Sequence, residues 1–319
     1  MDTPSAVQSD RSRTDDQTAE RLRRHRSRQH LEQLVVKLAL LLVALISVLT
    51  TIGILFALLK DSIGFFVDVP VWEFLFGTKW TALFIPQHFG VLPLVAGTLL
   101  VALIAGVIAL ALGMGAAIFL SEYAPDRLRR VLKPVLEILA GIPTVVYGFF
   151  ALSFVTPLLQ VFFEDLIIFN ALSAGVVMGL MIMPMVSTLS EDAMVSVPGS
   201  LRDAAYALGA TRFEVATKVV VPSALSGIVA SLILAVSRAI GETMIVYLAA
   251  GSLANLTFNP LEPVQTMTAY IAQIATGETA QGSIVFKSIF AVGLLLFLMT
   301  LGMNILGRWV IARYRQQYE

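Results

Sequence analysis

The sequence has no cysteine and only three histidines, His25, His30 and His88, which are far apart along the chain. Disulfide bonds, thiolate metal sites and cysteine nucleophiles are therefore excluded, and the scattered histidines give no support to an intramembrane hydrolase or a metal enzyme. The motifs G-x-x-x-x-G-K-[ST], H-E-x-x-H and G-x-S-x-G are also absent. We therefore expect a chain that is not an enzyme, holds no metal or cofactor, and does not itself bind and hydrolyse ATP.

Charged residues are also scarce, since Asp, Glu, Lys and Arg make up only 14% of the chain, whereas 57% of its residues are hydrophobic. With a mean hydropathy of +0.83, a chain of 319 residues is too apolar to be a soluble globular protein. The 22 basic and 22 acidic residues balance, so net charge indicates no particular partner, and we expect no nucleic acid. The composition predicts an integral membrane protein.

Six long apolar runs predict an all-α, polytopic membrane protein with six transmembrane helices. Each run is near the roughly 20 residues that cross about 30 Å of hydrocarbon. Their approximate limits are 38–59, 91–120, 131–155, 166–188, 224–250 and 286–310. Pro143 and Pro184 fall inside the third and fourth runs, where proline must kink or interrupt a helix. Together with Gly141, they are the candidate positions for helix kinks or gating.

The distribution of charge predicts the orientation. Lys and Arg concentrate before the first run and after the second, fourth and sixth, and are few or absent in the alternating segments. By the positive-inside rule, both termini and the segment after the fourth run face the cytoplasm. We predict a basic cytoplasmic tail over 1–33, a first transmembrane helix over 34–60, an extracytoplasmic loop over 61–90, a core of five transmembrane helices over 91–312 that includes a cytoplasmic loop over 189–222, and a cytoplasmic tail over 313–319.

Two of these segments have further features. The arginine-rich residues 1–33 have too few apolar side chains to bury a core, so we expect them to be partly disordered, and the first run is too long for a signal peptide. The loop over 61–90 carries four aromatic residues, which fit either half-wet positions at the outer membrane interface or a small folded core within the loop. These residues are Trp72, Phe74, Phe76 and Trp80. The sequence leaves both alternatives open.

Between Ser200 and Pro222 the sequence predicts two short helices joined by a glycine turn. Ser200 has the spacing of a capping box with Asp203, as does Thr211 with Glu214. Gly209 can take the left-handed conformation that ends a helix, and Pro222 closes the second helix. One apolar stripe is expected on the first helix. It consists of Leu201, Ala204, Ala205 and Leu208. From this pattern alone, the helix pair is either a docking surface for a partner or an ordinary loop on the bilayer surface.

A charged pair, Arg238 and Glu242, lies in the fifth apolar run between Ser237 and Thr243. An arginine in the middle of a membrane span costs roughly 2.5–3.5 kcal/mol on insertion scales. Residues four apart share a helix face, so the two charges can neutralise one another. We interpret the pair as part of a transport path for an oxyanion, because a guanidinium can donate to two oxygens at once. A structural ion pair that fixes the helix register is the alternative.

Several stretches of the chain resemble a known family. The residues Asp203-Ala204-Ala205, Gly209, Val219 and Val221-Pro222 are similar to the EAA loop of ABC importer permeases, E-A-A-x3-G-x9-I-x-L-P, with Asp for Glu, Val for Ile and Val for Leu. Three further strings resemble PstC-type permeases of phosphate-specific ABC importers. They are SRAIGETMIV, GIPTVVYGFFAL, and FLFGTKW followed by FGVLPLVAGTL. The resemblance extends from about Val71 to the C-terminus.

The resemblance implies a type I ABC importer permease (MetI-like) fold in the bacterial inner membrane. It implies that Arg238 and Glu242, with Ser237 and Thr243, lie on a phosphate path. It also implies a set of residues that couple the chain to an ATPase: Asp203, Ala204, Ala205, Leu208, Gly209 and Pro222. The implied partners are a second permease of the PstA type, a PstB-type ATPase dimer that hydrolyses ATP with Mg, and a PstS-type extracytoplasmic phosphate-binding protein.

Other functions remain possible at this point. The chain could carry another oxyanion such as sulfate, molybdate or phosphonate, since permeases for those ions share the EAA loop. A stand-alone anion channel or a secondary transporter could also be built from six spans, although it would leave the cytoplasmic helix pair without a role. A membrane protein that acts only in signalling is a third possibility.

Overall fold

The computed structural model describes the backbone of residues 5–314 and the side chains of residues 33–310. Within this part of the chain all regular secondary structure is helical, and an isolated bridge between Trp80 and Phe89 forms no strand. The predicted all-α class is therefore confirmed. The chain divides into two units, residues up to Ala57 and residues from Leu58 onward, and each is described by itself.

Helix α1 (Ser5–Phe66) contains the first predicted span, which lies within its apolar part, Gln33–Phe66. The helix already begins at Ser5, so the partly disordered tail predicted over 1–33 is wrong from that residue onward, and residues 1–4 lie outside the described part. The reason is that Arg and Gln, which are frequent here, favour the helix.

Helices α3 (Leu92–Ile118) and α7 (Ala171–Val195) pack along one another at the centre of the second unit, with α11 (Leu225–Ile240) against both. Glycines allow the close approach. A Cβ atom at Gly113 would lie 2.9 Å from the Cβ of Val186, and one at Gly179 would lie 2.7 Å from the Cβ of Ile108. Because lipid tails are as apolar as Leu, such close packing, rather than hydrophobic burial, holds membrane helices together.

Two bent helix pairs accompany the straight helices. Helix α4 (Asp126–Gly141) meets the run Thr144–Gln160 at 88°, and the run Arg212–Ser223 meets α11 at 70°. The third predicted run is therefore not one helix, because Pro143 has no N–H group and holds Ile142 in an extended conformation with ψ 131°. Among the described residues, four helices are long and apolar enough to cross a membrane, or up to six if each bent pair is one span.

Helix α7 continues through Pro184 without interruption, unlike α4 at Pro143. Its N-cap is Asn170, whose side-chain oxygen accepts a hydrogen bond from the backbone N–H of Ser173. Its end lies beyond the predicted limit of residue 188. The prediction stopped too early because Glu191 and Asp192 lower the hydropathy of the last turns.

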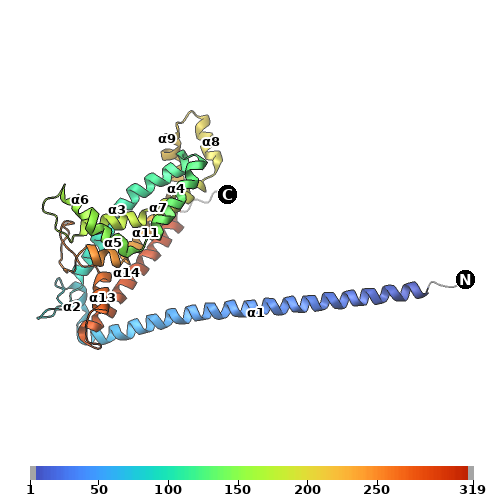
Figure 1. Ribbon diagram of the computed structural model, residues 1–319, viewed down its shortest axis with the longest axis horizontal. Helices are drawn as coiled ribbons and strands as arrows, with labels where there is room; N and C mark the ends of the chain where they lie inside the picture. The colour runs from blue at the N-terminus through green and yellow to red at the C-terminus, as the bar shows by residue number, and fades with distance from the viewer. Residues whose placement is uncertain (1–4, 315–319) are drawn as a thin grey trace. The chain divides into compact units, whose positions relative to one another are not determined.

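The two ends of the second unit carry different elements. Helices α8 (Gly199–Ala207) and α9 (Arg212–Val215) lie at one end, whereas α2 (Val71–Phe76) and α13 (Met267–Thr276) lie at the other (Figure 1). The segments 200–222 and 61–90 were predicted to face opposite sides of the membrane. Their positions at opposite ends of the helices agree with that prediction.

The end with α2 has a small core of aromatic residues. Phe74 and Trp80 are buried, and the Trp80 ring meets the ring of Tyr270 edge to face with 4.8 Å between centroids. Trp72 and Phe76, on the other side of α2, are 74% and 64% exposed and stack on one another. The loop thus has the folded core that was one of the two alternatives, while an interfacial role for the exposed pair stays a prediction.

Candidate functional site

Arg238 and Glu242 lie on either side of a break in the helix. Helix α11 ends at Ile240 and α12 (Met244–Ala249) begins after a turn, so the predicted continuous span over 224–250 is wrong. The two charges are still neighbours, with 3.8 Å between Nη1 of Arg238 and Oε2 of Glu242. The prediction that they share one face of an uninterrupted helix is therefore wrong.

The Glu242 side chain explains the break. Its Oε1 accepts a hydrogen bond of 3.1 Å from the backbone N–H of Met244, which is otherwise a free donor at the start of α12. Its backbone carbonyl accepts a hydrogen bond of 2.6 Å from the hydroxyl of Thr268. A carboxylate is favoured at a helix start, since the exposed N–H groups there carry partial positive charge. The Glu242 carboxylate therefore caps the start of α12 and pairs with Arg238 at the same time.

Burial differs between the two charges. The Glu242 side chain is 8% exposed, whereas that of Arg238 is 45% exposed, so the carboxylate is sheltered and the guanidinium is partly open. Nη1 of Arg238 also donates to the sulfur of Met181 on α7 at 2.9 Å, which is a weak acceptor. A guanidinium has five donors, and this arrangement leaves several of them available for an oxyanion.

The two residues next to the charged pair, Ser237 and Thr243, differ in burial and in hydrogen bonding. The Ser237 hydroxyl is buried and finds no hydrogen-bond partner among the described residues. The Thr243 hydroxyl is exposed and makes only a long contact of 3.4 Å to the carbonyl of Gly241. The structure therefore brings Arg238, Glu242 and Met181 together and leaves Ser237 and Thr243 beside them without specific bonds to the pair.

The segment over 200–222 begins differently from the prediction. Helix α8 has Pro198 as its N-cap and no capping side chain, so the capping box predicted for Ser200 and Asp203 is wrong. The extended conformation of Pro198, with ψ 135°, already sets the chain direction at the start of the helix. Gly209 has a φ of +82°, which confirms the predicted left-handed turn.

The start of α9 confirms the second capping box. The Thr211 hydroxyl accepts from the backbone N–H of Glu214, and the Glu214 carboxylate accepts from that of Thr211. The backbone N–H of Thr211 and then Lys218 lower the pKa of Glu214 to about 2. The helical path continues through η3 (Ala216–Val220), a π-helical turn, and α10 (Val221–Ser223), so it passes Pro222 and ends just beyond it.

The predicted apolar stripe of α8 is split between two faces. Leu201 and Ala205 pack against a small inner core that contains Val215 and Val220. Ala204 is exposed, and Leu208 is 90% exposed. The single stripe is wrong because α9 folds back on α8 and covers only part of it. The exposed apolar residues at this tip are Tyr206, Leu208 and Phe213.

A polar recess of about 570 Å³ lies beside this tip. It is bounded by two segments, the end of α3 with the following turn and the α8–α9 pair. The lining residues are Glu122, Tyr123, Ala124, Pro125, Tyr206 and Arg212. Exposed apolar residues next to a polar recess are typical of a surface that contacts another protein.

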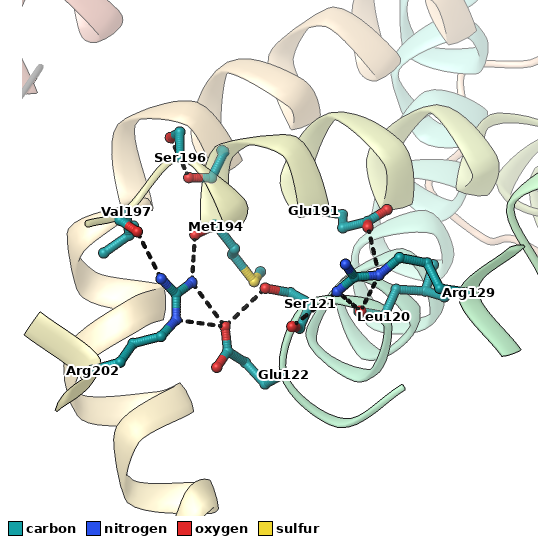
Figure 2. A network of polar contacts seen from close by, with 10 residues as sticks. Leu120, Ser121, Glu122, Arg129, Glu191, Met194, Ser196, Val197 and Arg202 are labelled. Carbon is teal, nitrogen blue, oxygen red and sulfur yellow. Dashed lines mark hydrogen bonds and ion pairs between the residues drawn. The ribbon is translucent and has the colours of Figure 1, made fainter. Parts of the chain in front are cut away.

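Sequence reasoning missed a group of charged residues at the ends of α3 and α7 that lie next to α8. Arg202 pairs with Glu122, and Arg129 approaches Glu191 (Figure 2). Lys133 also lies 3.0 Å from a Glu191 carboxylate oxygen. The Glu122 and Glu191 side chains are only 6% and 1% exposed. An acidic residue within or directly after an apolar run was the available signal, since such a group is costly unless it is paired.

Comparisons with known proteins identify the family. Residues 109–316 match the family described as the inner membrane component of binding-protein-dependent transport systems. A probable ABC transporter permease, YqgH, of Bacillus subtilis is 34% identical over 92% of this chain and 96% of its own length. The phosphate transport system permease PstC of Mesorhizobium japonicum is 34% identical over 76% of this chain and 78% of its own length.

The fold is shared with a solved structure. A chain of the MetNI methionine ABC transporter, in an inward-facing conformation, superposes with a TM-score of 0.53 at 19% identity, over 69% of this chain and 94% of that one. At this identity the likeness concerns the fold alone. The family match, the relatives and the several apolar helices agree. This chain is therefore a multi-pass membrane protein that belongs to the family of inner membrane components of binding-protein-dependent transport systems.

Proposed function

We propose that this chain is the membrane-spanning permease subunit of an ATP-driven phosphate importer. The substrate is supported by the PstC relatives, which are phosphate transport permeases by name and cover about three quarters of this chain. The chemistry is supported by a partly exposed guanidinium at a helix break. Together these features favour phosphate over the other oxyanions considered from the sequence.

The pair of Arg238 and Glu242 carries the proposal. Discontinuous membrane helices commonly form substrate sites, because their ends present charges and free backbone groups inside the bilayer. Here the buried carboxylate holds the arginine in place, and the 45% exposed guanidinium faces open space where an anion can approach. Because Glu242 stays close, it weakens the attraction between Arg238 and a phosphate. A weak, transient site suits a transport path, which must release its ion.

Energy for transport comes from other proteins in this proposal. The sequence has no phosphate-binding loop, so a separate ATPase dimer of the PstB type binds ATP and Mg and docks on the exposed tip of α8 and α9. A second permease of the PstA type completes the path, and a phosphate-binding protein of the PstS type docks at the end with α2. Both termini and the α8 end face the cytoplasm.

Uptake by the reconstituted complex tests this function. The chain is placed in liposomes with its second permease, ATPase and binding protein, and ATP-dependent uptake of radiolabelled phosphate is measured. We expect Arg238→Gln to lower uptake between about 10- and 150-fold, because a hydrogen bond to a charged group is worth about 1.5–3 kcal/mol. Arg127→Gln, which changes an exposed arginine of α4, is the control and should leave uptake unchanged.

Three results would contradict the proposal. Uptake of phosphate that is unaffected by Arg238→Gln would remove this residue from the path. Phosphate flux through the isolated chain without ATP would instead favour the anion channel that the sequence left open. Competition by sulfate, molybdate or a phosphonate at concentrations equal to that of phosphate would reassign the substrate to another oxyanion.

A further inference from the structure

We propose that Arg202 is a positioning residue, which through Glu122 and the backbone carbonyls at the end of α7 makes the coupling helix α8 move as one body with the inner ends of α3 and α7. This inference rests on the proposed function, because it concerns how a displacement of α8 by an ATPase reaches the anion path. It differs from the route expected from the sequence, in which the displacement passes along the chain through Pro222 into α11.

The Arg202 guanidinium joins three elements. Its Nη1 donates to the carbonyl of Val197 at 2.7 Å, and its Nη2 donates to the carbonyl of Met194 at 2.8 Å, at the end of α7. Nε and Nη2 donate to Oε1 of Glu122 at 3.3 and 3.1 Å. Glu122 belongs to η1 (Phe119–Tyr123), the π-helical turn that ends α3. One side chain of α8 thus bonds both α7 and α3.

A second arginine makes the reciprocal contacts (Figure 2). Arg129 of α4 donates through Nε to the carbonyl of Leu120 at 3.0 Å and through Nη2 to that of Ser121 at 3.2 Å, both in η1. Its Nε also lies 3.5 Å from Oε1 of Glu191 on α7. Arg202 therefore bonds carbonyls at and just beyond the end of α7 and a carboxylate of η1, while Arg129 bonds carbonyls of η1 and a carboxylate of α7.

These contacts matter because α8 has little other attachment. No residue of α8 is buried, and only Leu201 and Ala205 pack partly against the inner core. The Arg202–Glu122 pair is mostly sheltered, with side chains 20% and 6% exposed. The last carbonyls of a helix lack internal partners and carry partial negative charge, so a cation that meets them is bound firmly. Loss of the arginine would release α8 and leave Glu122 without its cation.

Helix α7 links this cluster to the proposed anion site. At its inner end the Met194 carbonyl accepts from Arg202, and 13 residues earlier the Met181 sulfur contacts Arg238. At 1.5 Å per residue, the two points are about 20 Å apart along one helix. Between them, the hydroxyls of Ser190 on α7 and Ser231 on α11 are 2.8 Å apart. By contrast, the path through Pro222 contains a π-helical turn and the 70° bend before α11.

Spin labels can test whether α8 and α7 move together. The chain has no native cysteine, so Ala207→Cys on α8 and Val195→Cys at the end of α7, both exposed, take labels selectively. The distance between labels is measured in the assembled complex with and without bound ATP. We expect one narrow distance in both states for the otherwise unchanged chain. In Arg202→Gln we expect a broad distribution that shifts when ATP binds.

Transport gives the second readout. In Arg202→Gln we expect the ATPase to remain bound and active, while the number of phosphate ions carried per ATP falls at least fivefold. Glu122→Gln should give a loss no larger than this, because Arg202 keeps its bonds to the Val197 and Met194 carbonyls, and the double variant should be no worse than Arg202→Gln, because the Glu122 contact is already lost there. Arg202→Lys should restore only part of the ratio, since one ammonium group cannot reproduce the forked contacts. Arg127→Gln is the matched control.

The outcomes separate this inference from the proposed function. A label distance in the unchanged chain that shifts with ATP, or a normal phosphate-to-ATP ratio in Arg202→Gln, overturns the role of Arg202. Additive losses in the double variant also overturn it. If the unchanged complex carries no phosphate with ATP, the proposed function fails instead, and the label distances still report whether α8 and α7 form one body.

Discussion

Gly209, in the turn between α8 and α9, offers a clean test of the coupling segment. Its φ is +82°, a conformation that residues with a Cβ atom rarely adopt, and no atom lies within 4 Å of where a Cβ would be. A substitution there is therefore strained through the backbone alone and not through a clash. For a residue other than Gly, Asn or Asp, the left-handed conformation costs roughly 1–2 kcal/mol.

The same helix provides a matched control. Gly199 opens α8, and it also has nothing within 4 Å of its added Cβ, but its φ is ordinary. Gly199→Ala should be neutral or slightly stabilising, because Ala favours a helix by up to about 1 kcal/mol over Gly. Gly209→Ala should destabilise the turn by about 1–2 kcal/mol, and Gly209→Val by more, since a β-branched residue fits a positive φ poorly. Gly209→Asn should cost least.

Two measurements on the reconstituted complex test this prediction. Thermal unfolding reports stability, and phosphate carried per ATP reports coupling. A strain of 1–2 kcal/mol shifts a local equilibrium roughly 5- to 30-fold, enough to lower the coupling ratio measurably while ATPase activity persists. Equal values for Gly209→Ala and Gly199→Ala in both assays would refute the argument that the left-handed turn sets the geometry of α8 and α9.

Three further predictions concern packing, capping and pH. Gly113→Ala should lower thermal stability because its Cβ would crowd Val186 on α7 at 2.9 Å, whereas Gly115→Ala, with open space around it, should not; equal stability would contradict the close α3–α7 contact. Thr211→Ala should cost about 1 kcal/mol through the lost N-cap, visible as a lower unfolding midpoint. The pKa of Glu214 is lowered from 4.5 to about 2, so this carboxylate contributes its full stabilisation above pH 4.5 and loses it progressively as the pH falls from 4.5 through 2. The difference in unfolding midpoint between Glu214→Gln and the unchanged chain should therefore be constant from pH 8 to pH 5, and a difference that shrinks over that range would contradict it.

Local patterns predicted much of this structure. The apolar runs identified most of the long helices, because crossing a bilayer demands about 20 apolar residues in sequence. The capping box of Thr211 and Glu214 and the left-handed Gly209 were also predicted, since each depends on residues within one turn. Where the determining contacts are local, sequence spacing is sufficient.

The predictions from the sequence fail where residues far apart in the chain, or competing local effects, determine the structure. The spacing of Ser200 and Asp203 suits a capping box, but Pro198 starts the helix earlier. The break after Ile240 was missed because the apolar run continues through it, and only the bonds of Glu242 to Met244 and Thr268 reveal why the helix stops. The contact between Arg202 and Glu122 joins residues 80 positions apart, and no local pattern encodes it.

The three sheltered carboxylates of the second unit follow one rule. Glu122, Glu191 and Glu242 are 6%, 1% and 8% exposed, and each lies near a helix end or break where it meets a partly exposed cation. A carboxylate at lipid depth needs such a partner, and a helix end needs groups that satisfy its free backbone. Ion pairs therefore mark the places where α8, α4 and α12 attach to α3 and α7, which pack closely on one another at glycines. Because close backbone packing resists sliding, α3 and α7 should move as a unit during transport, and the bonds of Arg202 to Glu122 and Met194 should carry α8 with them.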